Sequence, residues 1–261
     1  MRENRVKRAL EGGGIAVGTM MLEFDTPGIP RIAAAAGAEF AVFDMEHTGW
    51  SLETIKRLVA ASRGTELVPI VRPPAGQYHF VARLLDVGAM GIVLPMMESA
   101  EQAREAVRFT RYPPDGCRGA AFTLAHDDYQ PGDVAAKMRS ANEERLLVAL
   151  IETVQGVERA AEIAAVDGVD VLWIGQFDLT NSMGIPGQFT HPDFHRAVAR
   201  VLEACQRHGK AGGFGSLDVA ELQARRAQGF RFLVYTADVW IYQQALRQGL
   251  ATLQGRCGGL A

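Results

Sequence analysis

Short apolar runs recur along the whole chain, and the segments between them repeat apolar residues at helical spacing. In residues 51–62, for example, Leu52, Ile55 and Leu58 fall on one helical face, and residues 194–206 show the same period. Eight runs have the length and the β-rich composition of buried strands: residues 15–20, 40–44, 67–71, 91–95, 146–151, 169–174, 212–214 and 230–235. Strands and helices are therefore predicted to alternate along the chain.

The predicted strands are apolar throughout instead of alternating with polar residues, which indicates strands that are covered on both faces. Eight strand–helix units favour a single α/β domain over residues 1–261, folded as a closed (β/α)8 TIM barrel. An open, doubly wound sheet is the alternative that this pattern leaves open. Residues 112–133 interrupt the alternation with prolines and glycines, and we expect a functional or mobile loop there.

Composition and charge narrow the class of protein. Hydrophobic side chains make up 48% of the chain and charged ones 22%, ordinary values for a globular protein. The net charge of −3 comes without a basic block, so nucleic acid is not an expected partner. No apolar run approaches the ~18 residues of a membrane span, and the charged first residues lack the core of a signal peptide. We therefore expect a cytoplasmic protein, with Cys117, Cys205 and Cys257 as reduced thiols because they form no CxxC pair.

Polar side chains follow several of the predicted strands, where barrels of this kind build their active sites. The residues at these positions are Asp44, Glu46, His47, Arg72, Glu152 and Asp178. Because the carboxyl ends of parallel strands meet at one mouth, we expect these side chains to converge there.

Glu152 and Asp178 follow neighbouring strands, and their oxygens are ligands of the kind that Mg²⁺ or Mn²⁺ accepts. A bound cation would also relieve the repulsion between the two carboxylates. Each acid alone can instead cap the following helix. The two acids together favour a metal site.

Arg72 stands between a β-rich run and two prolines, which stiffen the backbone around it. Its guanidinium can grip a substrate carboxylate or stabilise an enolate oxygen, or it can form an ion pair that closes the top of the barrel. A lone histidine in a turn is more often a surface or capping residue than a catalyst. The acidic neighbours of His47, which are Asp44 and Glu46, favour a role in the site.

Eight short motifs stand in an order and spacing that are far more specific than any one of them. They are FDMEH at residues 43–47, VRP at 71–73, LLDVGA at 84–89, VLPM at 93–96, YPPDGCRG at 112–119, IET at 151–153, IGQFDL at 174–179 and MGIPG at 183–187. Together they resemble the HpcH/HpaI family of class II, metal-dependent pyruvate aldolases, to which 2,4-dihydroxyhept-2-ene-1,7-dioate aldolase belongs. The resemblance covers nearly the whole chain.

The resemblance implies a role for each residue of the site. Glu152 and Asp178 match the ligands of a divalent metal ion, which is Mg²⁺, Mn²⁺ or Co²⁺. Arg72 matches the arginine that binds the substrate and stabilises the pyruvate enolate. His47 and Asp86 match an acid/base pair beside the metal.

The resemblance also implies a residue that orders the site and an association of several subunits. Asp44 matches a further acid that helps to order the site through water or through the loop that carries the histidine. The last helix, for which residues 237–254 are the candidate, is exchanged between subunits in this family. The expected partner is a second copy of the chain, within a homo-oligomer that is typically a hexamer, a trimer of dimers.

Two positions depart from the family pattern. Leu150 stands two residues before Glu152, where many members carry Gln, so a hydrogen bond near the substrate is either missing or supplied elsewhere. Phe177 stands before Asp178 in place of a smaller or polar residue, beside backbone N–H groups that we expect to bind the pyruvate carboxylate. These changes point to a different oxo acid, a bulkier donor or a less polar aldol product.

We therefore expect a class II aldolase, a lyase that joins or cleaves pyruvate, or a similar 2-oxo acid, and an aldehyde. A Schiff-base mechanism needs a lysine at a strand end or inside the barrel. None of the four lysines is predicted there; they are Lys7, Lys56, Lys137 and Lys210. One alternative is another enolate lyase, of the citrate or malyl-CoA type or using phosphoenolpyruvate, although no nucleotide or phosphate motif is present. The other alternative is a barrel that has lost catalysis and serves as a binding protein.

Overall fold

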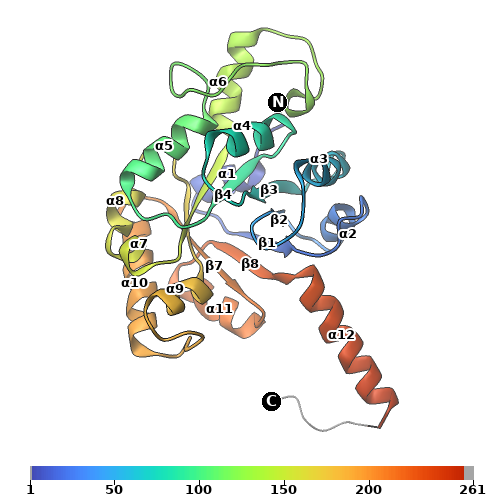
Figure 1. Cartoon of the computed structure of the whole chain (residues 1–261), viewed down its shortest axis with the longest axis vertical. Coiled ribbons are helices and arrows are strands. Elements are labelled where there is room, and N and C mark those ends of the chain that lie inside the picture. Colours follow the sequence, from blue (N-terminus) through green and yellow to red (C-terminus); the bar gives the residue numbers. More distant parts are fainter. Residues whose placement is uncertain (1, 256–261) are drawn as a thin grey trace.

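Eight parallel strands close into a barrel in the computed structural model of the protein, which describes residues 2–255 (Figure 1). The strands are β1 (Ala16–Met21), β2 (Phe40–Asp44), β3 (Val68–Arg72), β4 (Gly91–Leu94), β5 (Leu146–Ile151), β6 (Val171–Ile174), β7 (Ala211–Ser216) and β8 (Phe232–Ala237). They agree with the eight predicted runs apart from small shifts at the ends. Because β8 pairs with β1, the prediction of a TIM barrel is confirmed and the open sheet is wrong.

The helices alternate with these strands, as the apolar spacing predicts. They are α1 (Arg5–Glu11), α2 (Ile29–Ala35), α3 (Leu52–Ala61), α4 (Tyr78–Asp86), α5 (Ala100–Thr110), α6 (Val134–Glu144), α7 (Val154–Glu158), α8 (Ala160–Ala164), α9 (Gln176–Ser182), α10 (Pro192–Arg207), α11 (Val219–Gln228) and α12 (Asp238–Leu253), with a short 3₁₀ helix η1 (Ala125–Asp127). Side-chain caps fix several starts; the hydroxyl of Ser99, for example, accepts a hydrogen bond from the Gln102 N–H and begins α5.

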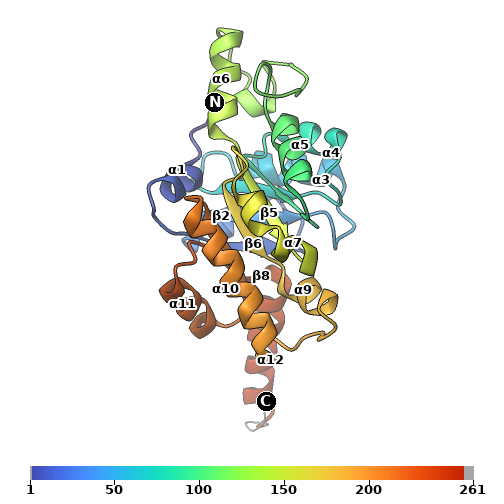
Figure 2. The same cartoon turned by 90° about the vertical axis from the view of Figure 1, so that its left-hand side faces the viewer.

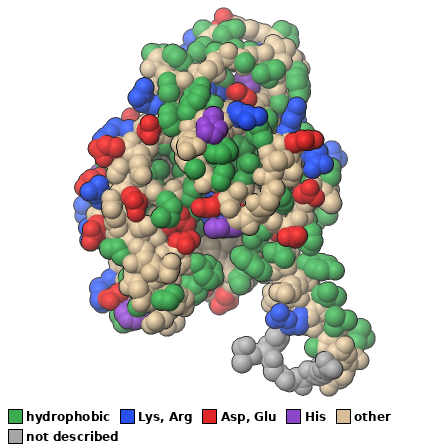
Figure 3. All heavy atoms as spheres, viewed as in Figure 1, with side chains coloured by type: hydrophobic (Ala, Val, Ile, Leu, Met, Phe, Trp, Pro, Cys, Tyr) green, Lys and Arg blue, Asp and Glu red, His purple; other side chains and the backbone are tan. Residues whose placement is uncertain are grey.

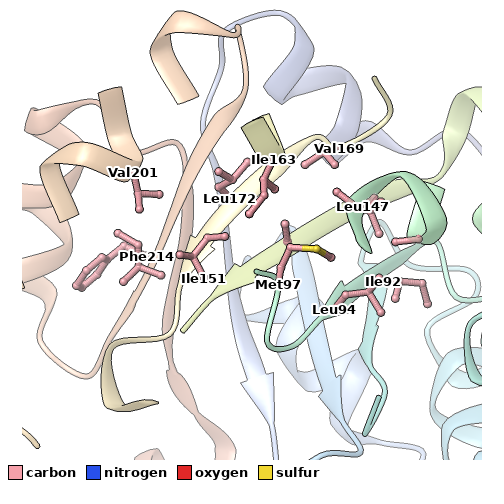
Figure 4. Close-up of a cluster of buried hydrophobic side chains, with 14 of the residues drawn as sticks. Ile92, Leu94, Met97, Leu147, Ile151, Ile163, Val169, Leu172, Val201 and Phe214 are labelled. Carbon is pink, nitrogen blue, oxygen red and sulfur yellow. The ribbon is translucent and has the colours of Figure 1, made fainter. Parts of the chain in front are cut away.

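The strands turn every second residue toward the barrel interior, as their pleat requires. Val42 of β2 and Leu150 of β5 belong to the interior cluster. The intervening residues pack against the helices in an outer cluster, which Figure 4 shows between strands β4 to β7 and helices α8 and α10. The next inward positions after Val42 and Leu150 are Asp44 and Glu152, so the strand period itself brings these carboxylates to the barrel mouth.

Helix α1 closes the amino-terminal end of the barrel. Val6 and Leu10 belong to the interior cluster, and Nζ of Lys7 lies 3.0 Å from Oδ1 of Asp170. Asn4 caps the helix, because its side-chain oxygen accepts a hydrogen bond from the Lys7 N–H at 3.1 Å. We call the contacts of Asn4 and Lys7 the N-terminal closure.

Helix α12 leaves the barrel instead of covering it. Two perpendicular views show it extending away from the other elements (Figures 1 and 2), and Asp238 is its only buried residue. The outer faces of β1 and β8 are correspondingly open, since Val17 and Tyr235 are 42% and 36% exposed. The predicted last helix is present. Its exchange between subunits concerns contacts with a second chain and stays a prediction.

Residues 112–133 lie at the amino-terminal end of the barrel, beside α6 (Figure 1). They follow α5, and a segment that joins a helix to the next strand lies opposite the active-site end of such a barrel. Asp127 is buried and accepts hydrogen bonds from the N–H groups of Thr123 and Leu124, both at 2.8 Å. This loop is therefore tied to its own end of the barrel and does not reach the strand ends.

Two expectations from composition concern membranes and thiols. Within residues 2–255, no helix has both the length and the apolar character that crossing a membrane requires. Cys117 and Cys205 are free thiols, and Cys257 lies outside the described residues.

Candidate active site

A cavity of about 600 Å³ opens at the carboxyl ends of the strands. Its lining includes most of the residues that the sequence singles out: His47, Arg72, Leu150, Glu152, Phe177 and Asp178. Figure 3 shows acidic and histidine side chains around a hollow on the side of the barrel from which α12 projects. The structure therefore brings together the polar side chains that follow β2, β3, β5 and β6.

Arg72 is held by Asp44, which is fully buried. The Nε and Nη2 groups of Arg72 donate to the two carboxylate oxygens at 2.7 and 2.9 Å. Burial acts to lower the pKa of Arg72, but the hydrogen bonds and charge of Asp44 outweigh it and raise that pKa. The same carboxylate accepts the N–H groups of Glu46 and His47, so Asp44 also orders the loop that carries the histidine.

His47 lies at the surface of the cavity, with 58% of its side chain exposed. Its acidic neighbour is Glu46, whose Oε2 is 3.8 Å from Nε2 of His47 and 3.3 Å from Nε of Arg72. That oxygen is buried and makes no hydrogen bond within the described part of the chain. Burial raises the pKa of Glu46, so this carboxylate is under-solvated at the wall of the cavity.

Glu152 is 3% exposed and follows β5. Its Oε2 accepts a hydrogen bond from the Met96 N–H at 2.9 Å. Burial, followed by the nearby charges of Glu46 and Asp178, raises the pKa of Glu152 to about 7 against the opposing effect of the Met96 N–H. Glu152 thus carries an unrelieved electrostatic cost when it is ionised.

Gly175 makes room for Glu152, a role that strand patterning did not reveal. A Cβ at Gly175 would lie 2.5 Å from Oε1 of Glu152, so any other residue here would force the Glu152 side chain to move. Gly175 is also the N-cap of α9, which has no side-chain cap and carries Asp178 in its first turn. The signal in the sequence is a glycine that directly follows a buried strand at the barrel mouth.

Trp173 of β6 occupies the barrel interior beside the glycines of β7. A Cβ at Gly213 would lie 2.8 Å from Cβ of Trp173, and one at Gly215 would lie 3.4 Å from the indole Cζ2. The glycines of β7 therefore accommodate a large side chain from the neighbouring strand. Trp173 in turn forms part of the cavity lining.

Asp86 does not lie in this cavity. It is the last residue of α4, which leads into the amino-terminal end of β4, so it is at the opposite end of the barrel. Its Oδ1 accepts a hydrogen bond from Nη2 of the buried Arg118 at 2.7 Å, and that guanidinium lies over the ring of Tyr112. A single chain therefore does not bring His47 and Asp86 together, and their pairing stays a prediction.

The charges at the cavity fit a divalent cation. One arginine, Arg72, faces four carboxylates, those of Asp44, Glu46, Glu152 and Asp178, so negative charge is in excess. Within residues 2–255, no three or more His, Cys, Asp or Glu side chains form a ready-made metal cluster. Glu152 and Asp178 both line the cavity, and an ion that takes most of its ligands from water and substrate needs no more than such a pair of acids.

Known proteins resemble this chain in sequence and in fold. The family model for HpcH/HpaI aldolase/citrate lyase matches residues 19–244. The hydroxypyruvate/pyruvate aldolase of Roseovarius nubinhibens is 36% identical over 248 residues, which are 95% of this chain and 96% of that protein. The 2-keto-3-deoxy-L-rhamnonate aldolase of Klebsiella pneumoniae is 34% identical, over 95% of this chain and 92% of that protein.

The crystal structure of the HpcH/HpaI aldolase from Desulfitobacterium hafniense matches with a TM-score of 0.92 and 35% identity. The match covers 95% of this chain and 96% of that one. The resemblance read from the eight motifs is thus confirmed, and the chain belongs to the HpcH/HpaI aldolase/citrate lyase family.

Proposed function

We propose that this protein is a class II, metal-dependent aldolase that acts on pyruvate, or a similar 2-oxo acid, and an aldehyde. In the addition direction, C3 of pyruvate loses a proton, a bond forms between C3 and the aldehyde carbon, and the aldehyde oxygen gains a proton. Cleavage is the reverse. The observation that carries the proposal is one cavity in which a fixed arginine, Arg72, lies among under-solvated carboxylates at the strand ends.

Glu152 and Asp178 are the residues that would hold the ion. A divalent cation supplies Lewis-acid stabilisation of negative charge on the substrate, worth several kcal/mol. Glu152 binds a cation only when it is ionised, and its Oε2 is fixed by the Met96 N–H. Gly175 leaves the space in which the carboxylate can take that position.

Arg72 binds and orients the 2-oxo acid and stabilises the enolate oxygen. Asp44 fixes Nε and Nη2 before substrate arrives, and Nη1 makes no hydrogen bond within residues 2–255, so it can donate to a substrate oxygen. Loss of one contact of this kind costs about 10²–10³-fold in rate. His47 moves the proton to or from the aldol oxygen, directly or through water, which contributes ~10²–10⁴-fold.

Exchange of the pyruvate methyl protons for deuterium, followed by NMR, tests the proposal because it requires no knowledge of the aldehyde. We expect exchange with Mg²⁺, Mn²⁺ or Co²⁺, and its loss after EDTA treatment or in Glu152→Ala. The matched control is Glu203→Ala, because Glu203 is an exposed carboxylate on the outer helix α10. Absence of exchange in the folded, metal-loaded protein would contradict the proposal.

The cavity lining fits a coenzyme A lyase, a phosphoenolpyruvate-using enzyme or a Schiff-base aldolase less well. Arg72 is the only lysine or arginine among its described lining residues, and Asp44 already engages it. A coenzyme A ester or phosphoenolpyruvate carries phosphate groups that need further cationic or N–H partners. None of the four lysines lines the cavity, so Schiff-base chemistry has no nucleophile there.

We also propose that α12 packs on a second copy of the chain. Its side chains Tyr242, Leu246, Leu250 and Leu253 recur at helical spacing and are 46% to 86% exposed, and Figure 3 shows hydrophobic side chains along the projecting helix. The open outer faces of β1 and β8 offer apolar surface of the kind that such a helix covers. The family resemblance extends this proposal to a hexamer.

Light scattering of the purified protein tests this assembly. The wild type is expected to elute as a homo-oligomer, and Leu246→Glu to dissociate, because the new charge would be buried without a partner. Gln248→Glu, which places the same charge elsewhere on α12, is the matched control. A monomeric wild type would overturn the proposal.

The pair that the resemblance assigns to His47 can form only between chains, so we propose that Asp86 of the partner subunit supplies it. The accessible Asp86 carboxylate, 34% exposed, is consistent with such a contact. His47→Ala and Asp86→Asn should each be inactive. Oligomers assembled from an equal mixture should regain activity at about a quarter of their sites, whereas a structural role for Asp86 would give no recovery.

A further inference from the structure

The cavity at the strand ends has two sides that differ in chemistry. The titratable lining residues all end or follow β2, β3, β5 or β6: His47, Arg72, Glu152 and Asp178. The remaining strands, β7, β8 and β1, are neighbours in the closed sheet. They and the segments that follow them contribute Met20, Leu22, Gly215, Ser216, Leu217, Val234, Thr236 and Trp240. None of these eight described residues carries a charge, and we call them the apolar arc.

Apolar surface continues beneath the charged side of the cavity. Leu150 is the inward residue directly below Glu152 in β5 and is 1% exposed. Phe177 is 64% exposed, stands next to Asp178, and packs edge-to-face on Phe189 at 5.0 Å between ring centroids. A substrate held by the charged residues therefore meets apolar side chains both below it and across the cavity.

The two hydroxyl groups of the apolar arc offer few partners to a polar ligand. Oγ of Ser216 already donates to Oε2 of Glu221 at 2.6 Å and accepts from the Asp218 N–H at 3.1 Å. Thr236 has a φ of 48°, an uncommon conformation for a β-branched residue, and strain of this kind collects at functional sites. Thr236 leaves a single hydroxyl for a ligand on this side.

We infer that the acceptor aldehyde has an apolar body, aliphatic or aromatic, and is not polyhydroxylated; this inference rests on the proposed aldolase function. With the 2-oxo acid at the charged side, the aldehyde chain lies against the apolar arc. Apart from one that reaches Thr236, each hydroxyl on that chain would lose water without gaining a side-chain partner in the apolar arc, whereas each methylene buried there raises kcat/KM roughly fourfold. Leu150 and Phe177 point to a different oxo acid, a bulkier donor or a less polar aldol product, and an apolar aldehyde corresponds to the less polar product.

Propanal and D-glyceraldehyde form a matched pair of probes, because they share a three-carbon chain and differ by two hydroxyls. With saturating pyruvate and Mg²⁺, we expect kcat/KM to be at least about tenfold higher for propanal, and to rise from propanal to butanal to 3-methylbutanal. Leu217→Asn places an amide in the apolar arc, at a residue that is 56% exposed. This variant should lower the propanal-to-glyceraldehyde ratio about tenfold.

The matched control is Ile32→Asn, which makes a similar change on the outer surface of α2, where Ile32 is 62% exposed. It should leave the ratio unchanged. The methyl-proton exchange of pyruvate is measured in every variant, because it reports a folded, metal-loaded enzyme without an aldehyde.

The outcomes separate the inference from the function on which it rests. Exchange together with a preference for glyceraldehyde, or with a ratio that Leu217→Asn does not change, overturns the apolar acceptor and leaves the aldolase standing. Absence of exchange in the wild type overturns the aldolase, and the inference falls with it.

Discussion

At the amino-terminal end of the barrel, a buried ammonium meets its partner within the chain: Lys7 lies 3.0 Å from Asp170. At the carboxyl-terminal end, Glu46 has a buried oxygen that receives no hydrogen bond from residues 2–255, Glu152 has a pKa raised to about 7, and both share Arg72 with other acids. The N-terminal closure is thus satisfied within the chain, whereas the carboxylates at the other end carry an excess of negative charge. Perturbed groups of this kind mark functional sites, where a cation and substrate supply the missing partners.

Glu152→Gln should give the largest effect and sharpen this comparison, because it separates function from stability. We expect methyl-proton exchange to fall on the order of 10³-fold or more, since a neutral amide does not replace an anionic metal ligand. The amide oxygen can still accept the Met96 hydrogen bond, so the metal-free variant should be more stable than the wild type at pH 8. Urea unfolding checks the second statement, and a less stable variant would contradict it.

Lys7→Met, in the N-terminal closure, should lower stability and leave activity unchanged, the opposite of Glu152→Gln. It leaves the carboxylate of Asp170, 13% exposed, without its ammonium partner, and breaking such a pair costs about 3 kcal/mol. For a chain of this size that corresponds to a fall of roughly 6–12 °C in Tm. The exchange rate per folded enzyme should not change, and Lys56→Met on the exposed surface of α3 is the control. A loss of activity without a loss of stability would break the comparison.

Gly175→Ala tests whether metal binding depends on the space that Gly175 leaves for the Glu152 side chain. The added Cβ would meet Oε1 of Glu152 at 2.5 Å, so the carboxylate must move from its position. We expect metal affinity, measured by calorimetry with Mn²⁺, and exchange rate to fall about 10–100-fold. Gly28→Ala, at a glycine with negative φ where a Cβ would meet only an ordinary contact at 3.9 Å, should change neither quantity.

The most gradual effect, small over any one pH unit, is the change in stability of the metal-free protein with pH. Glu152 binds a proton more tightly in the folded state, with a pKa of about 7 against 4.5 in the unfolded chain. Its contribution to stability is therefore fully present below pH 4.5 and is lost as pH rises toward 7, by at most about 1 kcal/mol per pH unit. The difference in Tm between wild type and Glu152→Gln isolates this contribution. A difference that stays constant from pH 5 to 8 would contradict it.

The sequence was sufficient to predict the barrel and the side chains that gather at its carboxyl-terminal mouth, and the reason is geometric. Buried strands leave continuous apolar runs, and their pleat carries the inward positions on to Asp44, Arg72 and Glu152. Residues that follow a strand therefore gather at one mouth without any knowledge of long-range contacts. Hence His47 and Asp178 also line the cavity at this mouth.

Features that depend on what lies across the barrel were not accessible in this way. Asp86 ends a helix, so it belongs to the opposite end, and a motif match carries no information about the chain from which its partner comes. The role of Gly175 depends on where the Glu152 side chain lies, and the glycines of β7 depend on the size of Trp173. Such pairwise fits between neighbouring strands leave no periodic signal in a single sequence.

Trp173 makes ligand binding in this cavity visible by light. Trp173 and Trp240 line the cavity, whereas Trp50, the third tryptophan of the chain, lines a separate groove beside α4. Intrinsic fluorescence therefore contains two emitters that contact a bound ligand and one that serves as an internal reference. Occupancy of the site can be followed in real time and without a label, including by ligands that the enzyme never converts.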